Sequence, residues 1–367
     1  MIKFYFSLKK ILTMFYLPSL FTFLILYGFS LYLDKQNRVR RDYILLILAV
    51  ICVLIIGLRN PAYWIDTWAY VESFKTSAKL ENFSFVDTAD IYTEKGYYLL
   101  CVIIRTFTDK AFVYLIVVGM LSMTFLFKSL RQYCFLPVLG LCIYIARYML
   151  ARDMNQMRAG LAISIVISFT YLLVSGNRKG EIKYILICWL TSYLHTSMLT
   201  AIPIVIMNHV KITRRWVYIG ILLSFFVSSA FSHQIMDFIS QSDTIRDMAT
   251  DYVDKEGENS KAYAADLTNP MIYYQCIILF IYTFMEEKLA PMSKYYYVFR
   301  NGYFMSTVIL IILCQYAVLS ARVSTIFATF EIFMIPMIFK ALPQMQRRLA
   351  YLVLLPPLVV FFMYNMH

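Results

Sequence analysis

The chain has 367 residues, of which 60% are hydrophobic and only 15% are charged. Soluble domains carry more charge than this, so the composition excludes an ordinary soluble enzyme. The formal net charge of +12 is attributed to Lys and Arg side chains that anchor cytoplasmic loops, and not to nucleic-acid binding.

Repeated apolar runs along the chain match the roughly 20 residues that a helix needs to cross a bilayer. Long runs without alternation indicate helices, and helices satisfy their own backbone in lipid. We therefore predict an all-α, polytopic transmembrane bundle of about 10–12 spans, forming a single integral membrane domain over residues 1–367. Full crossings are predicted at 15–33, 43–58, 111–127, 134–149, 159–174, 216–232, 271–285, 297–319, 326–342 and 349–366.

Two further apolar segments are predicted to be broken or re-entrant. Segment 96–107 is short and carries Arg105, and segment 184–207 has His195 in its middle and Pro203 after it. Broken helices are tolerated at membrane depth where they line protein or a wet cavity.

Loop charge predicts the orientation of the chain. The basic loop 34–42 is placed in the cytoplasm, and this puts loops 59–95, 150–158 and 233–270 outside. If 184–207 forms two short arms that meet near His195, the basic loop 208–215 returns to the cytoplasm.

Three polar donors precede the apolar run 159–174, namely Arg152, Gln156 and Arg158. Several donors at a helix entry suit a phosphate or pyrophosphate, because a guanidinium can bind two oxygens at once. The alternative is interfacial snorkelling or pairing with Asp153.

Arg59 ends a predicted crossing, seven residues before Asp66. The functional interpretation has Arg59 contacting an anion and Asp66 contacting a sugar hydroxyl or accepting its proton, and the alternative is a local ion pair. Trp68, Tyr70 and Tyr97 offer stacking faces for sugar rings, although aromatic belts at membrane interfaces have the same composition.

Ionisable groups inside a membrane are costly and indicate function by default. His195 and Arg322 are of this kind, and Glu94 stands at the start of segment 96–107, where a helix dipole would also favour it. The seven cysteines show no CxxC or Cys/His spacing, so no metal ion and no cofactor is expected.

The order of these residues resembles the EpsG-like group of bacterial polysaccharide polymerases, the Wzy-type O-antigen or capsule repeat-unit polymerases. The residues that carry the resemblance are Gly57, Arg59, Asp66, Tyr70, Glu94, Gly96, Tyr97, Gln156, Arg158, Ala162, His195, Ser197 and Arg322. The resemblance spans about residues 40–340.

This resemblance implies a multi-span inner-membrane glycosyltransferase of GT-C-like character. It would move a glycan from one undecaprenyl pyrophosphate carrier onto a new lipid-linked repeat unit at the periplasmic face, so the external loops would be periplasmic. Arg152, Arg158 and Arg322 would hold the pyrophosphate. Asp66, Glu94 or His195 would take the proton from the acceptor hydroxyl, with Asp66 ranked ahead of Glu94.

The expected partners are the lipid-linked glycan donor and acceptor and the bilayer, with a chain-length regulator and a flippase as further candidates. Two alternative functions stay open. An O-antigen ligase would use the same donor with a lipid A core acceptor, and a lipid-linked oligosaccharide flippase would need charges along a central path.

Overall fold

The computed structural model describes residues 20–61, 64–84, 94–174, 176–210, 212–231, 234 and 266–365. Within these residues every regular element is a helix, which confirms the all-α prediction. Most of the predicted periplasmic loop 233–270 lies outside the described residues.

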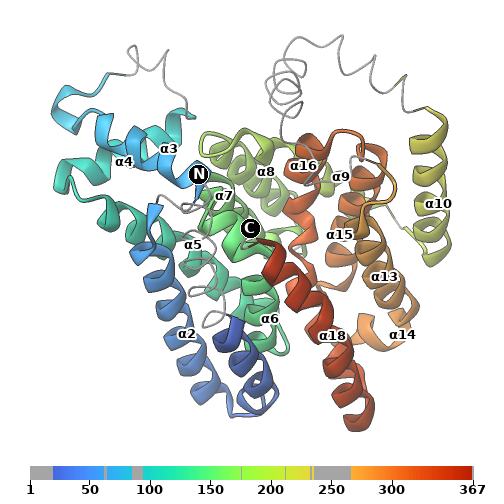
Figure 1. Ribbon diagram of the computed structural model, residues 1–367. Coiled ribbons are helices and arrows are strands. Elements are labelled where there is room, and N and C mark those ends of the chain that lie inside the picture. Colours follow the sequence, from blue (N-terminus) through green and yellow to red (C-terminus); the bar gives the residue numbers. More distant parts are fainter. Residues whose placement is uncertain are drawn as a thin grey trace, which may run out of the picture. The chain divides into compact units, whose positions relative to one another are not determined.

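The helices of the described chain, labelled as in Figure 1, are Leu20–Leu33, α2 (Arg38–Leu58), α3 (Ile65–Thr76), η2 (Leu80–Asn82), α4 (Lys95–Phe107), α5 (Ala111–Tyr133), α6 (Pro137–Tyr144), η4 (Ile145–Asp153), α7 (Met157–Ser168), η5 (Thr170–Val174), α8 (Arg178–Ser192), η6 (Thr196–Ala201), α9 (Pro203–His209), α10 (Arg214–Ala230), α13 (Pro270–Phe284), α14 (Glu286–Leu289), η8 (Ala290–Met292), α15 (Tyr296–Ile312), α16 (Ala317–Ala328), α17 (Glu331–Ala341) and α18 (Gln344–Asn365).

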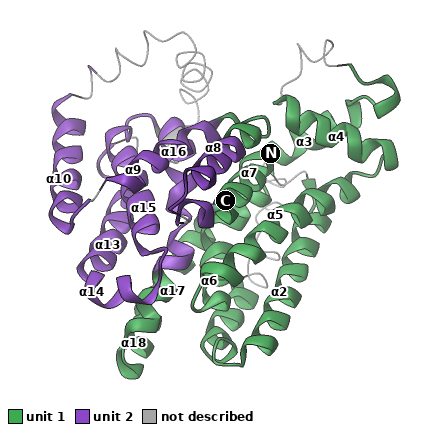
Figure 2. Ribbon diagram, turned by 180° about the vertical axis from the view of Figure 1, so that it is seen from behind, with its two compact units in different colours: residues 1–169, 189–196, 335–367 green, residues 170–188, 197–334 purple. Residues whose placement is uncertain are grey.

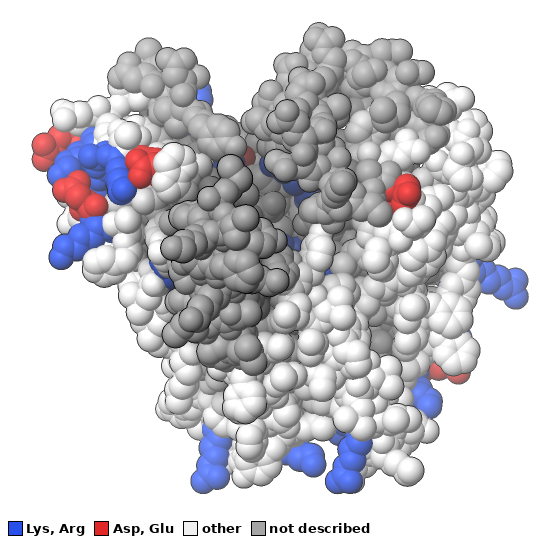
Figure 3. All heavy atoms as spheres, viewed as in Figure 1, with Lys and Arg blue, Asp and Glu red and all other residues white. Residues whose placement is uncertain are grey.

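In the described part of the chain, four helices are long and apolar enough to cross a membrane: α2, α5, the segment Met157–Val174 and α18. The pair α16 and α17 forms a fifth candidate, bent by 41° at its junction. Charged side chains occupy little of the surface in view (Figure 3). The chain is therefore a multi-pass membrane protein, while the count of 10–12 crossings stays a prediction.

Two crossings that were predicted as continuous helices are interrupted in the structure, so the prediction is wrong there. The predicted span 297–319 is interrupted, because α15 ends at Ile312 and α16 begins at Ala317. The predicted span 326–342 contains the break between α16 and α17 at residues 329–330. Neither break contains glycine or proline, so the apolar pattern alone predicted uninterrupted helices.

The chain divides into two compact units, coloured separately in Figure 2. The first unit comprises residues 1–169, 189–196 and 335–367, and the second comprises residues 170–188 and 197–334. The single domain over residues 1–367 stays a prediction.

The first unit is built around α5, which packs against α2 and α7. Helices α2 and α5 approach closely at Gly119, where an added Cβ would meet Ile56 Cγ2 at 2.8 Å. Beside α5, the rings of Phe74 in α3 and Tyr114 stack with centroids 4.6 Å apart. The Tyr97 hydroxyl of α4 and the Tyr114 hydroxyl lie 2.7 Å apart. These contacts hold α3 and α4 against α5.

The second unit is built around α15, which packs against α16, α10, α13 and α9. Arg300, only 1% exposed, forms an ion pair with Glu286 at 2.9 Å. Glu286 also accepts from Arg214 at 3.2 Å. These charges therefore connect the beginnings of α10 and α14 to α15.

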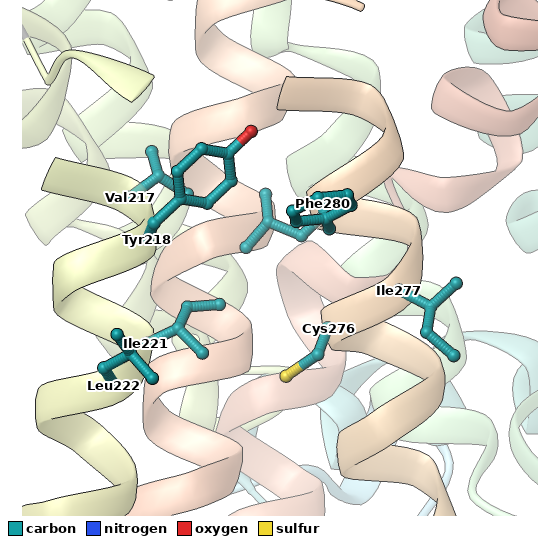
Figure 4. Close-up of a pocket in the computed structure, with 8 residues that line it drawn as sticks. Val217, Tyr218, Ile221, Leu222, Cys276, Ile277 and Phe280 are labelled. Carbon is teal, nitrogen blue, oxygen red and sulfur yellow. The ribbon is translucent and has the colours of Figure 1, made fainter. Parts of the chain in front are cut away.

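An apolar groove of about 390 Å³ opens between α10 and α13 in the second unit (Figure 4). Its lining residues are Val217, Tyr218, Ile221, Leu222, Cys276, Ile277, Leu279 and Phe280. No charged side chain lines it, which is typical of a surface that faces lipid chains.

Segment 184–207 is broken, as predicted. Helix α8 ends at Ser192, a turn over residues 193–195 follows, and the chain returns through η6 and α9. The two ends meet, because His209 Nε2 lies 2.9 Å from Glu181 Oε1 and the Asn208 amide donates to the Leu173 carbonyl at 2.7 Å. His195 therefore lies in the turn of a helical hairpin; its re-entrance into a membrane stays a prediction.

Candidate active site

The carboxylate of Glu94 is the centre of a cluster of polar side chains in the first unit. Glu94 forms an ion pair with Arg158, and its Oε1 lies 3.1 Å from His195 Nδ1. The same oxygen accepts a hydrogen bond from the backbone N–H of Thr196 at 3.3 Å. Three segments distant in sequence therefore meet at one carboxylate.

Arg158 stands in the first turn of α7, and Tyr70 of α3 holds it from the other side. The Arg158 Nε donates to the Tyr70 hydroxyl at 3.2 Å, and the guanidinium carbon lies 5.1 Å from the centre of the Tyr70 ring. Tyr70 is itself 4% exposed. Tyr70 thus orients the arginine, and its ring face is not open for stacking on a sugar.

The neighbours of Glu94 keep it ionised. Partial burial raises the pKa of Glu94, but the hydrogen bond to His195 and the charge of Arg158 outweigh burial and lower it to about 2. A carboxylate that accepts from the Nδ1–H of a histidine leaves Nε2 as the acceptor nitrogen of the neutral ring. The arrangement places a histidine ring against a carboxylate, next to a fixed cation, which is a geometry that general-base catalysis can use.

Arg59 connects α2 to α3 and to the first residue of α7. Its guanidinium donates to the Ile56 carbonyl, to Thr67 Oγ1 at 3.1 Å and to Met157 Sδ at 3.1 Å. Burial lowers the pKa of Arg59 to about 10, against the opposing charge of Asp153. Arg59 is thus a half-buried, charged connection between these elements.

Helix α3 is held to the turn at residues 154–155, which precedes α7, by two residues that the sequence analysis missed. The Thr67 hydroxyl donates to the Met154 carbonyl at 2.6 Å, and Asn155 Oδ1 accepts from the backbone N–H of Asp66 at 3.1 Å. Asn155 is a turn-forming residue directly before a helix, and this was the one available signal.

The predicted span 134–149 is α6 continued by η4, a π-helical segment that ends in Arg152 and Asp153. Asp153 accepts from the Tyr144 hydroxyl at 2.6 Å and from Ser122. Arg152 is 4% exposed and stands 4.0 Å over the ring of Tyr148. Both charges are therefore enclosed by the first unit.

The remaining predicted residues are more widely placed. Gln156 precedes α7 and makes no cap bond with its side chain, Trp68 is exposed on α3 and Asp66 is half-buried there. Tyr97 is fully buried. Arg322 lies on α16 in the second unit. The structure thus brings together Glu94, His195, Arg158 and Tyr70.

Among the described residues, no group of three or more His, Cys, Asp or Glu side chains is arranged to hold a metal ion. The cluster itself consists of side chains with acid–base and charge chemistry. They supply an acceptor nitrogen, a carboxylate and a guanidinium within one site.

The chain matches the EpsG family over residues 42–367. It is also similar to the amylovoran biosynthesis protein AmsC of Erwinia amylovora, with 24% identity over 174 residues. That match covers 47% of this chain and 46% of AmsC, so less than half the length of the relative is spanned. No solved structure matches the chain.

Proposed function

The chain belongs to the EpsG family, and from this premise we propose that it is a polysaccharide polymerase embedded in a membrane. In this proposal it is a glycosyltransferase that joins oligosaccharide repeat units carried on undecaprenyl pyrophosphate. The name of its relative, which refers to amylovoran biosynthesis, supports a role in making a polysaccharide.

The observation that carries the proposal is the contact of Glu94 with both His195 and Arg158. Transfer of a glycan needs a base for the acceptor hydroxyl and a cation for the departing diphosphate. The cluster contains a histidine that can serve as the base and an arginine that can serve as the cation, and both contact the Glu94 carboxylate.

In the proposed step, His195 Nε2 takes the proton of the acceptor hydroxyl. The hydroxyl oxygen attacks the anomeric carbon of the donor glycan and forms the new glycosidic bond. The bond from that carbon to the pyrophosphate oxygen breaks, and the polyprenyl pyrophosphate leaves with the electron pair. Glu94 orients the imidazole and stabilises the imidazolium that forms.

Arg158 is proposed to stabilise the negative charge on the leaving pyrophosphate. Arg152 is enclosed by the first unit and Arg322 belongs to the second unit, so neither is assigned to this cluster. Asp66 and Trp68 are proposed to contact the sugars. The contact with His195 favours the histidine over Asp66 as the base.

The reaction is proposed to take place at the periplasmic face of the bacterial inner membrane. The basic loop 34–42 supports this orientation, because Lys and Arg are retained in the cytoplasm. The donor and the acceptor would both arrive through the bilayer on their lipid carriers.

The test uses a strain that lacks its own copy of the gene, complemented with Glu94→Gln, His195→Ala or Arg158→Ala. Each variant should collapse the surface polysaccharide ladder on a gel to a single repeat, with protein levels in the membrane kept equal. Glu72→Gln and Arg131→Ala are matched controls for the carboxylate and the arginine, because these residues form exposed ion pairs on other parts of the chain.

Two results would contradict the proposal. Normal ladders in all three site variants would remove the site assignment. A strain without the gene that attaches no repeat at all, instead of a single one, would indicate a ligase.

A further inference from the structure

We propose that Gly96 and the main-chain carbonyl of Tyr193 form a backbone latch that positions His195 against Glu94. The inference rests on the proposed function, since it concerns the same cluster. The latch joins the beginning of α4, residues 94–97, to the turn of the helical hairpin, residues 193–196.

The first half of the latch consists of hydrogen bonds donated by α4. The first N–H groups of a helix have no partner within the helix and need acceptors from outside. Here the backbone N–H groups of Gly96 and Tyr97 donate to the Tyr193 carbonyl at 2.9 and 3.2 Å. The hairpin turn therefore caps α4.

The second half of the latch runs in the opposite direction. Glu94 occupies the cap position of α4, yet its side chain makes no cap hydrogen bond. Because the Tyr193 carbonyl already caps the helix, the Glu94 carboxylate is left to accept from Thr196 N–H and to contact His195. Capping and active-site geometry therefore depend on the same contact.

Close approach explains why glycine occupies position 96. A Cβ on Gly96 would lie 2.8 Å from Tyr193 Cβ, 2.8 Å from its carbonyl oxygen and 3.0 Å from its carbonyl carbon. Two of these atoms are backbone and cannot rotate away. The backbone conformation does not require glycine here, since Gly176 is the glycine with positive φ among the described residues.

A side chain at position 96 should therefore push the hairpin turn away from α4. The Glu94–His195 distance of 3.1 Å is already near the upper end for a hydrogen bond. A displacement of about 1 Å at a reacting group can lower a rate by about 10²-fold.

The experiment compares Gly96→Ala with two matched glycine variants. Gly28→Ala is the neutral control, because an added Cβ meets nothing within 4 Å. Gly119→Ala controls for the effect of a steric clash away from the latch, because its Cβ meets Ile56 at 2.8 Å in the α2–α5 contact. The purified proteins are assayed in detergent with lipid-linked repeat units extracted from the deletion strain.

Gly96→Ala should lower kcat by about 10²-fold with KM changed less than about 2-fold, and its Tm should be no lower than that of Gly119→Ala. In a His195→Ala background, Gly96→Ala should change the residual rate by less than about 2-fold, because residues that act through one another are not additive. A kcat of Gly96→Ala above half that of wild type would overturn the latch. The latch would also be overturned if Gly96→Ala lowered the rate by the same factor in the His195→Ala background as in the wild type.

The outcome of His195→Ala separates this inference from the proposed function. Full activity in His195→Ala would remove the proposed chemistry itself. A loss in His195→Ala together with normal kcat in Gly96→Ala would remove only the latch.

Discussion

Glu94 is one carboxylate with three donors, and this predicts how stability depends on pH. Its pKa is lowered from 4.5 to about 2 in the folded protein, so the stabilisation is present above about pH 4.5. It is lost as the pH falls through about 2. Since one pKa unit corresponds to about 1.4 kcal/mol, the contribution has an upper limit of roughly 3 kcal/mol.

The measurement is the Tm of wild type and Glu94→Gln in detergent between pH 7 and pH 3. The Tm difference should be largest at neutral pH and should shrink toward pH 3. A difference that grows on acidification would show that Glu94 is protonated in the folded state.

Arg59 and Arg158 are both charged, but their contacts predict that replacing each of them by lysine will have different effects. Arg59 donates to three acceptors on different segments, which the single ammonium group of lysine cannot reproduce. Arg59→Lys should therefore lower the free energy of unfolding by about 1–3 kcal/mol. Arg158→Lys should keep the Tm within about 2 °C and lower the rate of polymer formation by at least about 10-fold.

Thermal unfolding and the polysaccharide ladder, measured on the same membranes, check this contrast. Arg131→Lys serves as the control, because Arg131 forms an exposed pair with Asp42. A stable Arg59→Lys protein with a lost ladder would instead assign Arg59 to the substrate.

At this scale the sequence identified the participants of the site but not their contacts. Glu94, His195 and Arg158 were separate candidates, and their separations of 64 and 101 residues cannot be bridged by local patterns. Tyr70 and Tyr97 were predicted as sugar-stacking faces, whereas the structure uses Tyr70 to hold Arg158 and buries Tyr97 against Tyr114. The composition of a loop does not determine which of its rings become buried.

Among the elements, the helix formed by α6 and η4 depends on a cap from outside itself. Asp34 accepts from the backbone N–H groups of Val138 and Leu139, both at 3.0 Å, in the first turn of α6. Asp34→Ala should lower the free energy of unfolding by about 1–3 kcal/mol, because it leaves buried donors unpaired. Asp109→Ala, which removes an exposed ion pair, should cost less than about 1 kcal/mol.

Asp34 also predicts a pH dependence opposite in sign to that of Glu94. Burial raises the pKa of Asp34 to about 6, against the hydrogen bonds from Val138 and Leu139 and the charge of Arg41. Its stabilisation is present below about pH 4 and is lost as the pH rises through about 6. The Tm of wild type relative to Asp34→Asn should therefore fall between pH 4 and pH 7, and an unchanged difference would contradict the assignment.

Elements with a polar residue inside an apolar run were the most predictable. The break in 184–207 followed from a histidine in an apolar run and from loop charge, and the structure has the turn there, while the re-entrant path through a membrane stays a prediction. Segment 96–107 is likewise a short helix, α4, packed beside α3. The breaks in 297–319 and 326–342 were missed, although Gln315 stands in the first break and Thr329 and Glu331 stand at the second.

For the whole molecule, loop charge predicts which residues face each side of the membrane. Lys35, Lys179 and Arg215 belong to basic segments that are expected in the cytoplasm, and the Glu181–His209 contact brings residues near the latter two segments together. Lys79 directly precedes η2 and Glu81 lies within it, in the predicted periplasmic loop 59–95. The background for the test is Cys276→Ser, because the six other cysteines are buried.

Single cysteines at Lys79 and Glu81 should react with a membrane-impermeant maleimide in intact spheroplasts. Cysteines at Lys35, Lys179 and Arg215 should react only after the membrane is permeabilised. The five positions should show this same pattern of labelling whether or not the strain makes polysaccharide. The reason is that Lys and Arg near the span ends set the orientation of the chain during insertion. If Lys79 and Glu81 were protected while Lys35 reacted, the Glu94 cluster would face the cytoplasm, and a periplasmic polymerase could not use it.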